Sequence, residues 1–182
     1  MLNSNNKLSY KIIVDAMGGD NAPLNVVLGS VEAISEDEQI NIILVGKESE
    51  IKDIINSKNL NQKNISIVNA NEIIDMSDSP TKAIKSKPDS SIVVGANLVN
   101  QGEGDAFVSA GNTGAVVAAS TFIIGRLEGI ERPTIGTFIP SRSKVTTLFD
   151  IGAFVDSKPQ HLVSYAIMAS NYVKEIYGIE NP

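Results

Sequence analysis

Two short glycine-containing segments carry the residue types best suited to chemistry in this chain. The first follows a run of β-branched residues and reads Gly18-Gly19-Asp20-Asn21. Glycine allows a positive φ and lets a ligand approach the backbone closely. A helix that begins near Pro23 would direct free N–H groups and the positive end of its dipole at an anion. A glycine pair after a strand is also commonly a simple turn, so both interpretations stay open.

The second segment has the same order of strand, small residues and helix, and it reads Ser109-Ala110-Gly111-Asn112-Thr113-Gly114. Its small side chains leave backbone amides accessible to a ligand. Ser109, Asn112 and Thr113 add neutral donors for a phosphate or a carbonyl oxygen. The alternative is that Asn112 caps the helix and the small residues pack tightly. The spacing favours neither interpretation.

Cationic residues form a third candidate set around residues 134–138. They are Arg126, Arg132, Arg142 and Lys144. The planar guanidinium group of arginine suits phosphate. Most surface arginines are simply solvated, so each is a weaker candidate than the glycine segments.

The fourth candidate segment runs from Asp150 to His161 and again joins an acid, a glycine and the start of a helix. Lys158 and His161 lie at that helix start. His161 is the only histidine of the chain. A single histidine in such a place is more often a packing or surface residue than a catalyst.

The pattern of apolar residues predicts the elements that position these segments. The predicted strands are 10–15, 40–45, 65–69, 106–109, 134–138 and 146–150. The predicted helices are 24–35, 48–57, 90–101, 113–124 and 159–177, and 113–124 is so apolar that we expect burial on most sides. Strands that alternate with helices predict a three-layer α/β/α sandwich with a mostly parallel sheet. In such folds ligands bind at the carboxyl ends of the strands.

Residues 70–90 interrupt this alternation with a polar stretch rich in Asn, Asp, Ser, Pro and Lys. Ser79-Pro80 has the residue types of a helix cap and first helical position. The stretch is either a long surface connection or a functional ordered loop, since long ordered loops in compact domains are often functional.

Composition limits the function further. The 182 residues suffice for one α/β domain over 9–182, after a polar lead at 1–8 that we expect to be disordered. A net charge of −6 argues against nucleic-acid binding. The chain has no cysteine, and its single histidine excludes a histidine-rich metal site. No apolar run approaches the roughly 20 residues of a membrane span. We therefore expect a cytoplasmic protein without a metal.

Several nucleotide and hydrolase motifs are absent from the sequence. It contains no Gly-x-Gly-x-x-Gly fingerprint after a strand, no phosphate-binding loop ending in Gly-Lys-Ser/Thr, and no Gly-x-Ser-x-Gly elbow. We therefore expect no cofactor, and a dehydrogenase is a weaker interpretation.

The motifs together resemble the PlsX family of bacterial phosphate acyltransferases, and the resemblance covers nearly the whole chain in order. The matching segments are residues 14–23, 76–80, Lys87 with 89–91, 105–115, 125–127, 129–130, 132–133, 150–153, 155–156, 158–159 and 161–162. The resemblance implies a fold like that of the isocitrate and isopropylmalate dehydrogenases.

The resemblance also implies a reaction. The family transfers a fatty acyl group from acyl carrier protein to inorganic phosphate, and a membrane-bound acyltransferase passes the acyl group on to glycerol 3-phosphate. A homodimer is usual. We predict Asn112, Thr113, Lys158 and His161 as catalytic residues. The predicted substrate or phosphate ligands are Gly18, Gly19, Asp20, Asn21, Ser109, Gly111, Arg126 and Arg132.

The chain departs from the family in length and at Phe154, where the family usually has Asn. Family members continue past Pro182, so the chain corresponds to the N-terminal part of the family's length. We expect any peripheral membrane contact to lie in the remaining part. The alternatives are a phosphate acetyl- or butyryltransferase acting on coenzyme A esters, and a truncated binding domain without catalysis.

Overall fold

The structure, a computed structural model, describes residues 9–140, 145–152 and 156–182. The chain divides into two compact units, the first ending at Gly125 and the second beginning at Arg126. The single domain predicted over 9–182 stays a prediction. The predicted disordered lead at 1–8 lies outside the described residues, as do Arg142, Lys144 and Phe154.

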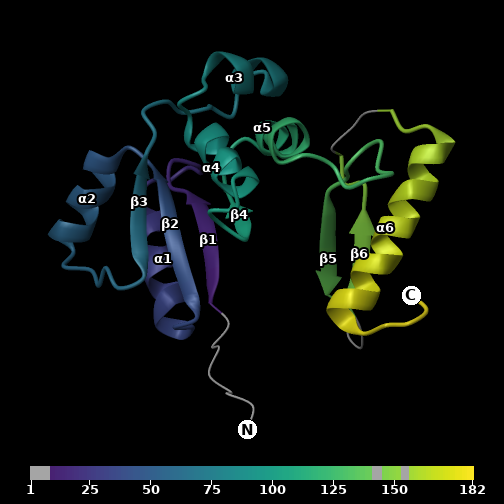
Figure 1. Cartoon of the computed structure of the whole chain (residues 1–182), viewed down its shortest axis with the longest axis horizontal. Helices are drawn as coiled ribbons and strands as arrows, with labels where there is room; N and C mark the ends of the chain where they lie inside the picture. The colour runs from purple at the N-terminus through teal and green to yellow at the C-terminus, as the bar shows by residue number, and fades with distance from the viewer. Residues whose placement is uncertain (1–8, 141–144, 153–155) are drawn as a thin grey trace, which may run out of the picture. The chain divides into compact units, whose positions relative to one another are not determined.

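The first unit is built on a four-stranded parallel sheet (Figure 1). Its strands are β1 (Tyr10–Asp15), β2 (Ile40–Gly46), β3 (Ile65–Asn69) and β4 (Ala106–Val108), in the order β3-β2-β1-β4. The chain moves outward from β1 to β3 and then returns to the other side of β1. The gap between the carboxyl ends of β1 and β4 is therefore the topological switch point, where ligands bind in open α/β sheets.

Helices cover both faces of this sheet. On one face α1 (Leu24–Glu36) and α2 (Glu48–Ser57) pack on the strands, through Val27, Ile34, Ile51 and Ile55 against Val14, Ile42 and Leu44. On the other face α4 (Ser91–Asn100) packs against Ile13, Val45 and Phe107. The alternation of side chains along each strand sends Ile13 and Val14 to opposite faces. The predicted α/β/α layering and parallel sheet are confirmed.

Three shorter elements form a second core beside α4. They are α3 (Pro80–Ser86), α5 (Thr113–Ala119) and the π-helix η1 (Ser120–Ile124). Ala115, Ala118 and Ala119 of α5 are buried against α3 and α4. The expectation that 113–124 is buried on most sides is wrong for its second half, where η1 has no buried residue and Phe122 is 68% exposed. This half lies where the chain leaves the first unit at Gly125, so fewer elements surround it.

The second unit consists of a β-hairpin and a long helix. Strands β5 (Gly136–Pro140) and β6 (Val145–Phe149) pair antiparallel, and α6 (Pro159–Tyr177) packs on β6. Only four residues separate the two strands, too few for the crossover of a parallel pair. β6 ends one residue before the predicted limit because Asp150 has a φ of +67°, outside the β region. Gly178, with a φ of +65°, ends α6 as predicted.

Candidate functional site

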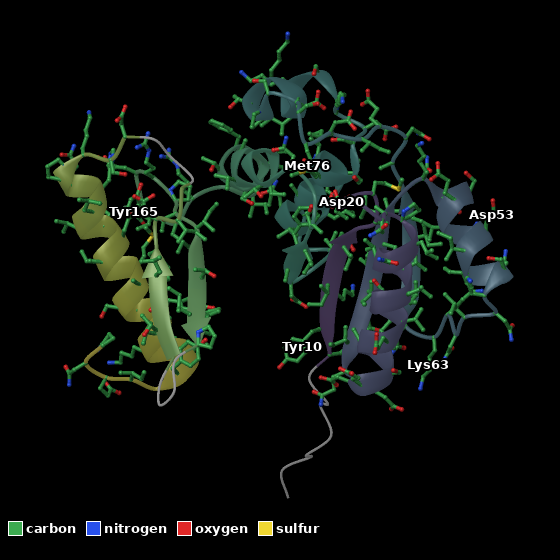
Figure 2. All side chains as sticks on the ribbon, turned by 180° about the vertical axis from the view of Figure 1, so that it is seen from behind. Tyr10, Asp20, Asp53, Lys63, Met76 and Tyr165 are labelled. Carbon is green, nitrogen blue, oxygen red and sulfur yellow. The ribbon has the colours of Figure 1, made fainter. Side chains whose placement is uncertain are left out.

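The two glycine segments of the sequence meet at the switch point of the first unit. A Cβ added to Gly18 would lie 2.7 Å from the backbone N of Gly111 and 2.5 Å from Oδ2 of Asp15. The two turns therefore touch backbone to backbone, and only glycine fits at residue 18. Gly19 adopts a φ of +105°, which disfavours any residue with a side chain. Asp20 lies at the end of the sheet that is farther from Tyr10 (Figure 2).

Asp15 connects the two turns through side-chain hydrogen bonds. Its side chain is 1% exposed, and Oδ1 accepts a hydrogen bond from the Met17 amide at 3.0 Å. Oδ2 accepts from the Ser109 hydroxyl at 2.7 Å, and Ser109 Oγ in turn accepts from the Gly111 amide at 3.0 Å. A buried carboxylate is tolerated when its oxygens are hydrogen-bonded. Asp15 and Ser109 therefore fix the relative position of β1 and the 109–114 turn.

Asn112 acts as the N-cap of α5, which confirms the capping alternative for its side chain. Oδ1 accepts from the Ala115 amide at 3.0 Å. Nδ2 donates to the carbonyls of Asp75 at 2.9 Å and Asp78 at 3.2 Å. The side chain is 5% exposed. Its amide thus ties the 75–78 loop to the start of α5, and the predicted catalytic role stays a prediction.

The polar stretch at 70–90 is ordered and consists of loop segments on both sides of α3. Lys87 Nζ donates to Asp78 Oδ2 at 2.6 Å and to the Ile73 carbonyl at 2.7 Å. This hydrogen bond lowers the pKa of the Asp78 carboxyl and raises the pKa of the Lys87 ammonium. Asp78 Oδ2 also accepts from the Asp75 amide, which holds the loop in shape. The loop therefore presents a fixed surface next to α5.

The remaining predicted residues of the first unit are accessible. Gly19, Asp20, Asn21 and Thr113 are exposed, whereas Gly18 is buried. Their backbone amides and the Thr113 hydroxyl are groups that hydrogen-bond to oxyanions. An apolar groove of about 350 Å³ lies beside the turns, between α1 and the sheet. Asp15, Ser109 and Ala110 line it together with apolar residues that include Val14, Val26 and Ile42.

The other four predicted residues belong to the second unit. Arg126 Nη1 donates to the carbonyl of Glu131. Arg132 Nη1 donates to the Asp156 carbonyl at 2.7 Å and lies 3.4 Å from His161 Nδ1. The same Nδ1 accepts from the Lys158 amide at 3.2 Å, so His161 closes the first turn of α6. The structure thus brings Arg132, Lys158 and His161 together at the start of α6.

Two residues whose hydrogen bonds hold the site in shape, Asp15 and Lys87, were not predicted as site residues. Asp15 and Lys87 stand in the matched motifs, but the prediction gave them no role. The signal for Asp15 was an acid at the end of a buried strand, directly before the glycines. Within the described residues, no group of three or more Asp, Glu or His side chains is arranged to hold a metal ion.

A parallel sheet with helices on both faces defines an α/β protein, and the two glycine turns lie at its switch point, where proteins of this class bind ligands. The sequence pattern of the family described as fatty acid synthesis protein matches residues 10–182. The chain belongs to this family. Of the helices in the described part of the chain, none combines the length and apolar character that a membrane crossing requires.

Similar proteins include the phosphate acyltransferases of Halothermothrix orenii and Acetivibrio thermocellus. The first is 46% identical over 94% of this chain and 52% of that protein, and the second is 44% identical over 94% and 50%. The chain therefore spans about half the length of these relatives. A phosphotransacetylase from Streptococcus pyogenes matches 94% of the chain with a TM-score of 0.70 at 22% identity and shares the fold.

Proposed function

We propose that the protein transfers an acyl group to inorganic phosphate, with a fatty acyl thioester of acyl carrier protein as the donor and acyl phosphate as the product. The observation that supports this proposal most is the contact between the Gly18 and Gly111 turns at the switch point. Two turns that expose backbone at one end of the sheet provide several N–H groups over a small area, and such groups stabilise the oxyanion formed when phosphate attacks a thioester carbonyl.

The attack itself requires positioning rather than a protein nucleophile. Phosphate supplies the attacking oxygen, and the thiolate of the carrier leaves. The exposed turn residues Gly19, Asp20, Asn21 and Thr113 are the donors that we assign to the carbonyl and to phosphate. Ser109 and Gly111 keep these turns in place through Asp15. The adjoining apolar groove suits the acyl chain of the donor, because it is lined mainly by apolar side chains.

The remaining predicted site residues belong to the second unit, and their roles are proposed from family membership. All three arginines of the sequence fall within residues 126–142. Arg132 donates to the Asp156 carbonyl at 2.7 Å and lies 3.4 Å from His161 Nδ1, and the planar guanidinium group of arginine is a type of group that suits phosphate. We assign Arg126 and Arg132 to phosphate binding, and we assign Lys158 and His161, at the start of α6, to the catalytic residues.

Three further points complete the proposal. The protein acts as a homodimer, it works in the cytoplasm with a peripheral contact at the membrane, and its product goes to a membrane glycerol-phosphate acyltransferase. These points rest on family membership.

The acidic carrier protein needs a local basic surface on this net-negative chain, since like charges across an interface disfavour binding.

The choice of acyl donor tests the proposal. The protein expressed from its natural reading frame is mixed with phosphate and either a long-chain acyl carrier protein, acetyl-CoA or butyryl-CoA, and thiol release is recorded. Phosphate-dependent release from the carrier-protein thioester alone supports the proposal. Release from the coenzyme A esters alone supports the phosphotransacetylase alternative, and no release from any donor supports a binding domain without catalysis.

A further inference from the structure

Helix α3 lies beside the glycine turns, at the carboxyl end of the sheet in the first unit (Figure 1). A Cβ added to Gly114 would lie 2.5 Å from Cγ of Pro80, so the first residue of α3 packs against the start of α5. The Asn112 side chain joins the same two elements, because its Nδ2 donates to the Asp78 carbonyl at 3.2 Å. A partner that contacts α3 is therefore next to the candidate site.

The inner side of α3 is fixed to the rest of the first unit. Ala83 and Ile84 are 4% and 9% exposed and belong to the core that α3 shares with α4 and α5. Lys87 Nζ, directly after the helix, lies 2.6 Å from Asp78 Oδ2 and 3.6 Å from Asp75 Oδ2. These contacts order the helix before any partner arrives, so that binding to it costs little conformational entropy.

The outer side of α3 carries two lysines. Lys82 and Lys85 are three residues apart, which places them on the same face of the helix, and both are exposed. Within the described part of the chain, neither forms a salt bridge. Residues 79–88 contain no acidic residue. This face therefore presents positive charge to solvent, although the net charge of the chain is −6.

The other described lysines of the first unit do not present such charge at this end of the sheet. Lys47 and Lys52 pair with acidic residues of α2, as Lys87 does with the loop before α3. The remaining three lie toward the amino ends of the parallel strands, where Figure 2 shows Lys63: they are Lys11, Lys58 and Lys63. Lys82 and Lys85 are thus the lysines at the end with the glycine turns that no acid neutralises.

An exposed apolar side chain lies at the same end of the unit. Met76, four residues before α3, is 67% exposed. Its carbonyl accepts a hydrogen bond from Asn112 Nδ2 at 3.4 Å, which fixes the loop that carries it. Figure 2 shows Met76 and Asp20 at this end. Because the methionine side chain adapts its shape to a neighbouring surface, it suits a protein partner.

We propose that Lys82, Lys85 and Met76 form the docking surface for an acidic protein, the carrier that donates the acyl group. The identity of the carrier rests on the proposed function, whereas the acidic character of the partner rests on the lysines. Opposite charges across an interface speed association and select the partner. Two lysines on a net-negative chain are too few for a nucleic acid or a membrane surface, which require several cations. A carrier bound to α3 holds its thioester beside the two turns.

Binding of the carrier, measured without phosphate, tests this surface. The protein expressed from its natural reading frame is titrated with acyl carrier protein bearing a palmitoyl group. The double variant Lys82→Glu with Lys85→Glu should weaken binding at least about tenfold, because both attractions become repulsions. The difference should shrink as salt is added, since salt screens exposed charges. In the acyl transfer assay the variant should raise KM for the carrier by a similar factor and leave kcat unchanged.

Matched variants separate docking from general effects of substitution. The double variant Lys58→Glu with Lys63→Glu makes the same charge change at the opposite end of the sheet and should leave carrier affinity unchanged. Lys82→Arg with Lys85→Arg keeps the charge and should bind as the parent does. Met76→Ala removes apolar contact area and should weaken binding about threefold. Lys82→Gln with Lys85→Gln should weaken binding about threefold and replaces the Glu variant if that variant does not fold.

Several results would overturn the proposal. Parent-like affinity in the α3 lysine variants or in Met76→Ala would mean that the carrier docks elsewhere. An equal loss in the Lys58 and Lys63 variant would mean that only net charge matters. Loss of binding to phosphatidylserine vesicles, with carrier binding unchanged, would mean a membrane surface.

The failures of docking and of the proposed function are distinguishable. Carrier binding that depends on the α3 lysines, without acyl transfer, would support the docking surface and refute the proposed function. Acyl transfer with the parent KM for the carrier in Lys82→Glu with Lys85→Glu would refute the docking surface and support the function.

Discussion

Replacement of Gly18 by alanine tests the contact between the two glycine turns. The added Cβ would lie 2.5 Å from Asp15 Oδ2, 2.7 Å from the Gly111 amide nitrogen and 3.0 Å from the Gly111 Cα. Two of these atoms are backbone, and the carboxylate is fixed by hydrogen bonds from Met17 and Ser109. No neighbour is therefore the free end of a flexible side chain, and the turns have to separate.

The expected cost follows from overpacking. Inserting a methyl group into a well-packed region costs about 1–3 kcal/mol, and we expect Gly18→Ala to reach the upper part of that range. Gly29→Ala is the matched control, because Gly29 lies in α1 and an added Cβ would meet nothing within 4 Å. Alanine is favoured over glycine inside a helix by roughly 0.5–1 kcal/mol, so the control should be more stable than the parent.

Urea unfolding followed by circular dichroism measures both variants. Amide hydrogen exchange of β1 and α1 reports the first unit separately, since two compact units need not unfold in one step. Gly18→Ala should lower the stability of β1 and α1 while Gly29→Ala raises it. If Gly18→Ala is as stable as Gly29→Ala, the two turns do not touch as described and the reasoning is refuted.

Three other substitutions test the supports of the site. Ser109→Ala leaves Asp15 Oδ2 buried without its donor and should lower the free energy of unfolding by about 1–3 kcal/mol. Ser35→Ala, at an exposed position, is the control. An equal loss of stability in the control would contradict a specific role of the Ser109–Asp15 hydrogen bond. Asn112→Ala should cost about 1 kcal/mol through the lost cap and should reduce turnover at least about tenfold, and near-normal acyl phosphate formation would remove Asn112 from the catalytic residues. Because the pKa of Asp78 is lowered from 3.8, its contribution to stability is complete above that value and disappears as the pH falls through the lower folded value. Because the pKa of Lys87 is raised from 10.5, its contribution is complete below that value and disappears as the pH rises through the higher folded value. The NMR chemical shifts of residues 71–89 should therefore change little between about pH 5 and 9. If these residues lose their structure at low pH in Lys87→Met just as they do in the parent protein, the interaction between Asp78 and Lys87 does not stabilise them.

The sheet of the first unit was predictable because strands β1, β2 and β3 are rich in Ile and Val. Ile65–Asn69 and Tyr10–Asp15 match the predicted bounds, and the glycines after β1 marked the turn. The helices followed from their apolar stripes for the same reason. These features depend on local sequence, which a pattern along the chain records directly.

The roles of individual polar residues were less predictable. Asn112 has the residue type of both a cap and an oxyanion donor, and its bonds to the 75–78 carbonyls depend on a loop 34–37 residues away. The Asp15–Ser109 bond spans 94 residues. The hairpin at β5 and β6 did carry a local signal, because the predicted strands 134–138 and 146–150 are only seven residues apart, too few for the crossover of a parallel pair, but the expectation of a parallel sheet obscured it. Long-range contacts of this kind leave no periodic trace in the sequence.

The identity of the phosphorus-containing product tests the central claim most directly. The protein expressed from its natural reading frame is incubated with acyl carrier protein bearing a palmitoyl group and with phosphate, and the mixture is followed by phosphorus-31 NMR. The account predicts a new acyl phosphate resonance that grows in step with thiol release and is absent without phosphate. Thiol release without that resonance, or release at the same rate when phosphate is omitted, would contradict it.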